Sequence, residues 1–395
     1  MNIILFDTPE LRKNLLPLTY TRPVAEFRCG IFTLSEKWSK RGQSISFLTD
    51  DYLSVKYPAN YYDDNIYLNG ATFYSSEILE ALKTLNNNEG IEQDGVLIAY
   101  RTSEKLKFNF DSSNFQLHTI NHNFQLLENT WDVFILNGQE IRNDYRWIAA
   151  NGTSKEINDK HTAVYGQENI FIEEGAKIKA SILNAENGPI YLGKGATIEE
   201  GSIIKGPFAL CDNATVNMGA KIKGDSTVGP HCKVGGEVSN SVLFGFSSKG
   251  HDGFIGNSVI GEWCNLGADT NTSNLKNNYA DVKLWNYQKG GFKNTESQFC
   301  GLIMGDHSKC GINTMFNTGT VVGVSANIFG SGFPRNFIPS FAWGGASGLV
   351  TYQPKKVYEV AQLVMIRRNK DFDEVEKSIM DKVFELSSEY RVWES

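Results

Sequence analysis

Apolar residues recur every six positions through the middle of the chain, and small or polar residues fill the positions between them. The first run is Leu192, Ile198, Ile204, Leu210, Val216, Ile222, Val228 and Val234, and the period resumes at Phe254, Ile260 and Leu266, and again at Met304, Cys310, Phe316, Val322 and Ile328. A period of six matches neither an amphipathic helix nor an alternating strand. It is typical of a prism of short parallel strands, in which one apolar side chain per face points inward and three hexapeptides close a coil. Chance periodicity in a glycine-rich β-sandwich is the alternative, and the eight consecutive matches argue against it.

The segments on either side of this solenoid carry other patterns. Residues 1–155 mix short apolar strands, at 3–6 and 96–99, with a helix at 76–82, which predicts an α/β domain with a layered sheet. The hexapeptide segment covers 165–340, with a polar loop at about 272–299. Residues 353–395 have helical spacing and predict two helices that cap the open end of the prism. Asn-Gly pairs at 69–70, 137–138 and 151–152 predict tight turns.

Composition and charge argue against several classes of function. A net charge of −7 over 395 residues leaves no basic surplus for nucleic acid. The first residues lack the basic and apolar regions of a signal peptide, and no run approaches the roughly 18 apolar residues of a membrane span. We therefore expect a cytoplasmic protein without membrane insertion. Six cysteines without a CxxC pair read as reduced packing residues rather than as zinc ligands.

Several spaced motifs in the solenoid resemble a known family. They are Gly250-His251, Gly256-Asn257-Ser258-Val259-Ile260-Gly261, Asn265-Leu266-Gly267-Ala268, Asn274-Leu275, and the run from Gly305-Asp306-His307 to Asn313-Thr314. They resemble the acetyltransferase half of bifunctional UDP-N-acetylglucosamine pyrophosphorylase/glucosamine-1-phosphate N-acetyltransferases, in particular the archaeal and Bacteroidetes-type versions. The resemblance implies a left-handed β-helix and a homotrimer that binds acetyl-CoA between neighbouring prisms.

The resemblance places the family's catalytic histidine at His251. Acetylation of an amino sugar needs a neutral amine, and a histidine with a pKa near the working pH suits the role of base. Phe254 stands where the family has a tyrosine, and Asn265, Gly267, Ala268 and Asn274 match positions that contact sugar or acetyl-CoA. The structural alternatives are a histidine that satisfies a corner carbonyl and asparagine ladders inside the prism. Gly235, Gly236 and Ser239 stand where the bacterial enzyme has basic residues, which leaves the acceptor sugar open.

The N-terminal segment carries a second resemblance. Leu16-Pro17-Leu18-Thr19-Tyr20-Thr21-Arg22-Pro23 is similar to a segment near the start of sugar-1-phosphate nucleotidyltransferases. This chemistry needs cationic clamps and Mg²⁺ around a nucleoside triphosphate, here UTP or dTTP. Arg22 is the best candidate for binding phosphate, and Arg28 and Lys37 are the next candidates.

The same segment departs from the family in three ways. Asp7-Thr8-Pro9-Glu10 replaces the glycine-rich phosphate loop, Val24 replaces a lysine, and no Gly-Asp metal signature follows a strand in the region 94–135. The metal ligands are therefore unknown, with Asp7 or Asp132 as candidates. Three interpretations stay open: a bifunctional acetyl- and nucleotidyltransferase, a nucleotidyltransferase alone with the prism as trimer scaffold, and a non-catalytic sugar-nucleotide-binding module.

Overall fold

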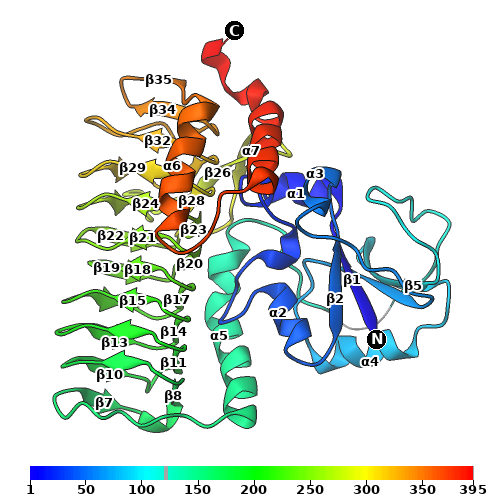
Figure 1. Ribbon diagram of the computed structural model, residues 1–395, viewed down its shortest axis with the longest axis horizontal. Helices are drawn as coiled ribbons and strands as arrows, with labels where there is room; N and C mark the ends of the chain where they lie inside the picture. Colours follow the sequence, from blue (N-terminus) through cyan, green and yellow to red (C-terminus); the bar gives the residue numbers. More distant parts are fainter. Residues whose placement is uncertain (120–122, 395) are drawn as a thin grey trace. The chain divides into compact units, whose positions relative to one another are not determined.

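The computed structural model describes residues 1–119 and 123–394, which divide into two compact units (Figure 1). Unit 1 comprises Met1–Phe27 and Phe32–Asn129, and unit 2 comprises Arg28–Ile31 and Thr130–Ser395. The short segment Arg28–Ile31 thus belongs to the second unit although the first surrounds it in sequence.

Unit 1 is a mixed six-stranded sheet with helices, which confirms the predicted α/β class. Its strand order is β2 (Ser44–Leu48), β1 (Asn2–Phe6), β3 (Asn65–Asn69), β5 (Val96–Thr102), β4 (Glu89–Gln93) and β6 (Gln116–Thr119). β1 runs parallel to β2 and β3, whereas β5 runs antiparallel to β3 and β4. Its helices are α1 (Pro9–Asn14), α2 (Leu34–Ser39), α3 (Asp51–Ser54) and α4 (Ser76–Thr84), with 3-10 turns at Leu18–Tyr20 and Val24–Glu26. Thr8, Thr33 and Ser75 cap α1, α2 and α4 with their hydroxyls.

Unit 2 is a β-solenoid of about 10 turns with three faces of stacked strands, which pair in parallel except for the last two strands of the third face. The first face holds β7 (Ala163–Tyr165), β10 (Ile182–Asn184), β13 (Ile203–Lys205), β16 (Lys221–Ile222), β19 (Glu237–Ser239) and β22 (Phe254–Gly256), followed by the pair β25 (Asn271–Thr272) and β30 (Met315–Phe316). The second face holds β8 (Ile170–Ile172), β11 (Ile190–Leu192), β14 (Phe208–Leu210), β17 (Ser226–Val228), β20 (Val242–Gly245), β23 (Val259–Glu262), β28 (Leu302–Met304), β31 (Thr320–Val322) and β33 (Phe337–Ile338). The third face holds β9 (Lys177–Ile178), β12 (Thr197–Ile198), β15 (Thr215–Val216), β18 (Lys233–Val234), β21 (Ser248–Lys249), β24 (Asn265–Leu266), β29 (Lys309–Cys310), β32 (Asn327–Ile328), β34 (Ala342–Gly345) and β35 (Gly348–Thr351).

One apolar column fills the interior of the solenoid. Every residue of the six-residue pattern lies in it except Phe254. The prediction for Phe254 is wrong because the coils shorten here: Val234 pairs with Lys249 and Val238 with Ile255, spacings of 15 and 17 residues instead of 18. Ile255 therefore points inward and Phe254 points outward. All six cysteines are buried, as predicted for packing residues. The left hand of the solenoid stays a prediction.

Helix α5 (Asp132–Asn151) packs on the solenoid along β14, β17 and β20. The turn predicted at 137–138 is wrong, because both residues lie inside this helix. Asn137 accepts a hydrogen bond from Gly30 N at 2.7 Å and donates one to Asp225 O at 2.9 Å. A Cβ on Gly138 would lie only 1.9 Å from Asp225 Oδ1, so glycine here permits close packing. Helix α5 therefore belongs to unit 2 by its contacts, although the sequence pattern placed residues up to 155 in the N-terminal domain.

The predicted polar loop and terminal helices are present. The loop contains a hairpin of β26 (Lys283–Asn286) and β27 (Gly291–Asn294). Helices α6 (Pro354–Ile366) and α7 (Glu374–Leu386) are followed by 3-10 turns at Ser388–Tyr390 and Val392–Glu394. They contact the side of the upper coils, where Phe384 meets Phe341, rather than covering the open end (Figure 1). Leu349 and Trp393 pack against that end of the column instead. In the described part of the chain, no helix has the length and apolar character to span a membrane.

Candidate functional site

The turn at 250–253, which we call the His251 turn, joins β21 on the third face to β22 on the first. His251 is exposed at this corner. The next coil supports the turn, because Asp269 N donates to Asp252 O at 3.0 Å. Three glycines in and below the turn, at 235, 236 and 253, lie so close to neighbouring backbone that an added Cβ would come within 2.5 Å of a carbonyl oxygen. The corner thus exposes an imidazole on a tightly packed main chain.

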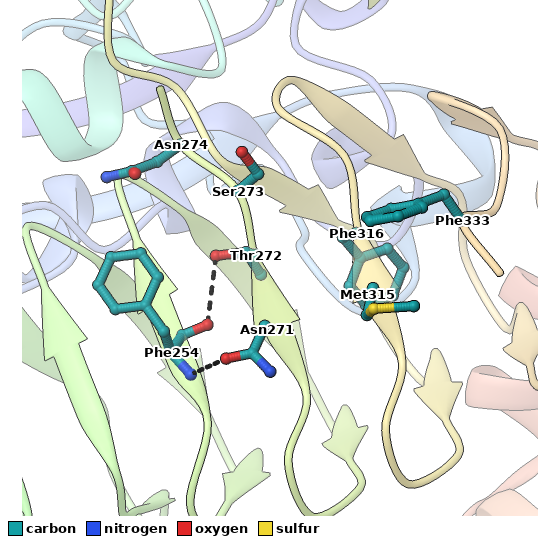
Figure 2. Close-up of a pocket in the computed structure, with 8 residues that line it drawn as sticks. All are labelled: Phe254, Asn271, Thr272, Ser273, Asn274, Met315, Phe316 and Phe333. Atoms are coloured by element: carbon teal, nitrogen blue, oxygen red, sulfur yellow. Dashed lines mark hydrogen bonds between the residues drawn. The ribbon is translucent and has the colours of Figure 1, made fainter. Parts of the chain in front are cut away.

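A pocket of about 350 Å³ opens on the first face immediately after the turn (Figure 2). It is lined by Phe254, Asn271, Thr272, Ser273, Asn274, Met315, Phe316 and Phe333. Asn271 Oδ1 accepts from Phe254 N at 2.9 Å, and Asn274 Nδ2 donates to Asn257 Oδ1 at 2.8 Å. Two predicted ligand-binding residues, Phe254 and Asn274, therefore line one pocket that combines aromatic and amide groups.

The other predicted solenoid residues lie elsewhere on the same coils. Asn265 is exposed on the outer side of the third face, in register with Ser248 and Lys309. Gly267 and Ala268 form the corner above the His251 turn. A Cβ on Gly267 would lie 2.5 Å from the Gly311 carbonyl carbon, and Ala268 O accepts from Asn313 N at 2.8 Å. Asn265 therefore lies on a different face from Phe254 and Asn274.

Asn265 lines a second cleft, of about 470 Å³, which we call the cationic cleft. It is lined by Lys233, Phe246, Ser248, Trp263, Cys264, Asn265, Lys309, Val364, Arg367 and Arg368. Four of these residues are cationic, and the lining residues that the structure describes include no aspartate or glutamate. Such a cleft favours a ligand with phosphate groups.

An aromatic ladder contributes two of its rings, Phe246 and Trp263, to the lining of the cationic cleft. The rings of His231, Phe246, Trp263 and His307 stack along one corner of the solenoid, with centroids 4.9, 4.2 and 6.2 Å apart. Burial, together with the charges of Arg368 and Lys370, lowers the pKa of His231. Burial also lowers the pKa of Lys309, whose Nζ donates to His307 O at 2.9 Å. Burial is the larger cause for His231, and the two neighbouring cations act in the same direction.

Sequence reasoning missed most of the cationic cleft. Lys309 lies inside the run 305–314 that carried the resemblance, so the motif itself contained that signal. Arg367 and Arg368 follow α6, and only the tertiary fold brings them to the third face. No pattern in the sequence connects these distant segments.

The three predicted phosphate-binding residues of the N-terminal segment do not share one unit. Arg22 and Lys37 are buried in unit 1, with exposed fractions of 4% and 1%. Arg28 belongs to unit 2, where its guanidinium donates to the carbonyls of Ile31 and Phe244. Gly30 O accepts from Thr227 Oγ1 at 2.9 Å in the same unit. Arg28 thus helps to attach the segment 28–31 to the solenoid.

A buried ion pair stands at the end of β1, where the family has its phosphate loop. Asp7 Oδ2 accepts from Arg12 Nη1 at 2.9 Å and from Thr49 Oγ1 at 2.6 Å, and Asp7 Oδ1 accepts from Val24 N at 3.0 Å. Arg12 also donates to the Thr19 carbonyl at 2.7 Å. Both oxygens of Asp7 are therefore occupied within the protein.

Asp7 in this arrangement does not suit a metal ion. The second candidate, Asp132, begins α5 and belongs to unit 2. Within residues 1–119 and 123–394, no group of three or more His, Cys, Asp or Glu side chains is placed to hold a metal. The described residues therefore do not fit a preformed Mg²⁺ site.

Comparison with known proteins finds one family model and several similar proteins. Residues 3–153 match the family model of sugar nucleotidyl transferases. The chain is 39% identical over 88 residues to the bifunctional protein GlmU of Methanocaldococcus jannaschii, covering 22% of this chain and 21% of the relative. It is 25% identical over 257 residues to GlmU of Wigglesworthia glossinidia brevipalpis, covering 60% and 50%. It is 30% identical over 168 residues to a bifunctional sugar-1-phosphate nucleotidylyltransferase/acetyltransferase of Sulfurisphaera tokodaii, covering 42% and 39%.

These matches span half or less of each relative's length. The name of the Sulfurisphaera tokodaii relative combines the two activities that the two resemblances in the sequence imply separately. Residues 3–153 thus match the sugar nucleotidyl transferase family model, and parts of the chain are similar to bifunctional GlmU proteins and to a bifunctional sugar-1-phosphate nucleotidylyltransferase/acetyltransferase.

Proposed function

We propose that this chain is a transferase of sugar-nucleotide synthesis whose solenoid moves an acetyl group from acetyl-CoA to an amino-sugar 1-phosphate. His251 acts as the base. The observation that carries the proposal is the His251 turn, which exposes an imidazole three residues before Phe254 of the aromatic and amide-lined pocket, on coils that also carry a cationic cleft. The similarity to bifunctional GlmU proteins supports it.

The chemistry assigns a role to each part of the corner. The pocket of Phe254 and Asn274 receives the sugar, because an aromatic ring and amide groups suit its apolar face and its hydroxyls. The cationic cleft receives the phosphates of acetyl-CoA. The neutral amine attacks the thioester carbonyl, and the new C–N bond forms as the C–S bond breaks. His251 takes the amine proton, and CoA leaves as a thiolate that receives this proton from the imidazolium to give the free thiol.

Release of free CoA thiol tests the acetyl transfer directly. We expect purified protein with acetyl-CoA and glucosamine-1-phosphate to release CoA, detected with a thiol reagent, and His251→Ala to lower the rate by about two to four orders of magnitude. The six protein thiols are buried and should contribute little signal. His161→Ala is the matched control, since His161 is also exposed but lies before β7 in the first coil. Equal rates for His251→Ala and the unmodified protein would exclude His251 as the base.

For unit 1 we propose nucleotidyl transfer to the sugar 1-phosphate, supported by the family match to residues 3–153. The buried Asp7–Arg12 pair favours a second candidate, a domain that binds sugar nucleotides without catalysis, since both Asp7 oxygens are occupied. Because the described residues do not fit a preformed Mg²⁺ site, we derive no step through the metal.

Pyrophosphate release decides between these candidates. UTP, dTTP, GTP and CTP are each combined with N-acetylglucosamine-1-phosphate or glucose-1-phosphate and added Mg²⁺. Pyrophosphate in any combination supports nucleotidyl transfer. Binding of the sugar nucleotide without pyrophosphate release supports the binding module. The resemblance also predicts a homotrimer, which light scattering in solution would test.

A further inference from the structure

Lys249 occupies an inward slot of the solenoid, between apolar residues of the coils on either side. In the third face it pairs with Val234 of the coil below, and the next coil places Leu266 in the column. The residue is 1% exposed. A lysine in such a slot loses hydration that an aliphatic residue would not need, so its presence requires a reason beyond packing.

The Lys249 ammonium reaches the His251 turn. Its Nζ donates to His251 O at 2.5 Å, to Asp252 O at 2.7 Å and to Gly235 O at 3.3 Å. An ammonium has three hydrogens, so these three acceptors use its full capacity. Burial lowers the pKa of Lys249 to about 8, while Asp252, Asp269 and Cys310 favour its charged form.

Other groups donate hydrogen bonds to the two remaining carbonyls of the turn. Asn217 Nδ2 donates to Gly250 O at 2.7 Å, and Glu237 N donates to Gly253 O at 3.0 Å. With Lys249 on the two carbonyls between them, each of the four carbonyls from 250 to 253 has a donor. Among the residues that the structure describes, the Lys249 ammonium alone contacts two of them from inside the column.

We propose that Lys249 is a positioning residue that fixes the main chain of the His251 turn and thereby the place of the imidazole. This proposal rests on the proposed role of His251 as base. A displacement of about 1 Å in a catalytic group can lower a rate by about 100-fold. The apolar column is thus a rigid support from which one ammonium holds the exposed turn.

The test is Lys249→Met, which keeps a long unbranched chain and removes the ammonium. We expect the thermal midpoint to stay unchanged or to rise, because a buried charge is removed. We expect kcat for acetyl transfer to fall by about 10- to 100-fold with KM changed less than about threefold, since the turn loses its order but the pockets remain. Amide hydrogen exchange in the peptide spanning 249–254 should become at least about tenfold faster, with other solenoid peptides unchanged.

Lys177→Met is the matched control, since Lys177 lies on the same face but points outward in the first coil. It should leave kcat and exchange unaltered. If Lys249→Met does not fold, Asn217→Ala removes one donor to the turn from outside the column and should lower kcat and speed exchange in the same peptide, by smaller factors.

Two results would overturn the proposal. One is wild-type kcat together with wild-type exchange in Lys249→Met. The other is a loss of activity that accompanies faster exchange throughout the solenoid, which would make Lys249 a stability residue. A wild-type protein without acetyl transfer would instead refute the proposed function, and the exchange measurement would still decide whether Lys249 orders the turn.

Discussion

Removal of one partner of the buried Asp7–Arg12 ion pair should strongly destabilise unit 1. Both side chains are buried, with exposed side-chain fractions of 1% and 8%, and the pair distance is 2.9 Å. At that distance and an effective dielectric constant of about 20, Coulomb's law gives an attraction of about 6 kcal/mol. Burial opposes this attraction strongly, and it raises the pKa of Asp7 in spite of the neighbouring Arg12. Removal of one partner still leaves an uncompensated buried group and costs about 3–5 kcal/mol.

A double-mutant cycle isolates the coupling of the pair. Asp7→Asn and Arg12→Met should each lower the free energy of opening of β1 and β3 by about 3 kcal/mol or more. The double variant should lose clearly less than the sum of the two, with a coupling energy of about 3 kcal/mol, because neither charge is then left alone. Hydrogen exchange of the β1 and β3 amides is the assay, since it reports unit 1 separately from the solenoid.

Arg101 and Asp64 provide an internal control for this cycle. They also form an ion pair, at 2.8 Å in the same unit, but their side chains are 29% and 59% exposed. Their coupling should stay within about 1 kcal/mol because solvent screens the pair. If the Asp7 and Arg12 effects add within about 0.5 kcal/mol, or equal those of the exposed pair, the argument from burial is refuted.

Two further predictions concern charge in the solenoid. The pKa of Lys249 is lowered from 10.5 to about 8, so between these pH values the unfolded chain binds a proton that the folded protein has mostly released. The free energy of unfolding should therefore rise with pH across this window, relative to that of Lys249→Met. Urea unfolding at several pH values measures this difference, and parallel pH profiles of the two proteins would contradict the prediction. Arg368→Gln should raise the pKa of His231, because Arg368 is one of the charges that lower it. An NMR titration of the imidazole measures this, with Arg335→Gln, outside the cationic cleft, as control; equal shifts in both variants would count against the cleft's potential.

The solenoid could be predicted from the sequence because its interior selects one apolar side chain per strand. That constraint repeats over many coils, so a period is visible even where single positions vary. The α/β class of unit 1 followed from short apolar strands between helices. In contrast, Asn137-Gly138 has the composition of a turn and lies in α5, since Asn137 bonds Gly30 and Asp225 while Gly138 permits close packing. Local propensity could not reveal these tertiary partners.

The candidate site was predictable only in part. The spaced motifs identified Phe254 and Asn274, which the fold places in one pocket. They did not indicate that Asn265 lines another cleft, or that Arg367 and Arg368 complete it from the end of α6. The missing phosphate loop was visible after β1, but its replacement was not, because Thr49 and Val24 reach Asp7 from distant positions.

Lys249 accounts for one departure from the family pattern, namely the glycines at 235 and 236, which stand where the bacterial enzyme has basic residues. Six residues before Ile255, the period predicts an aliphatic side chain and finds Lys249. Its ammonium can reach the turn carbonyls only if the turn lies close above the coil below. Gly235 and Gly236 allow this approach, since added Cβ atoms would come within 2.4 and 2.5 Å of the Gly250 and Gly253 oxygens. Basic side chains at these glycines would therefore push the turn away from Lys249. We infer that the coil below has glycines here because side chains would keep its backbone from supporting the turn. A cation that binds the sugar phosphate must then come from another part of the protein.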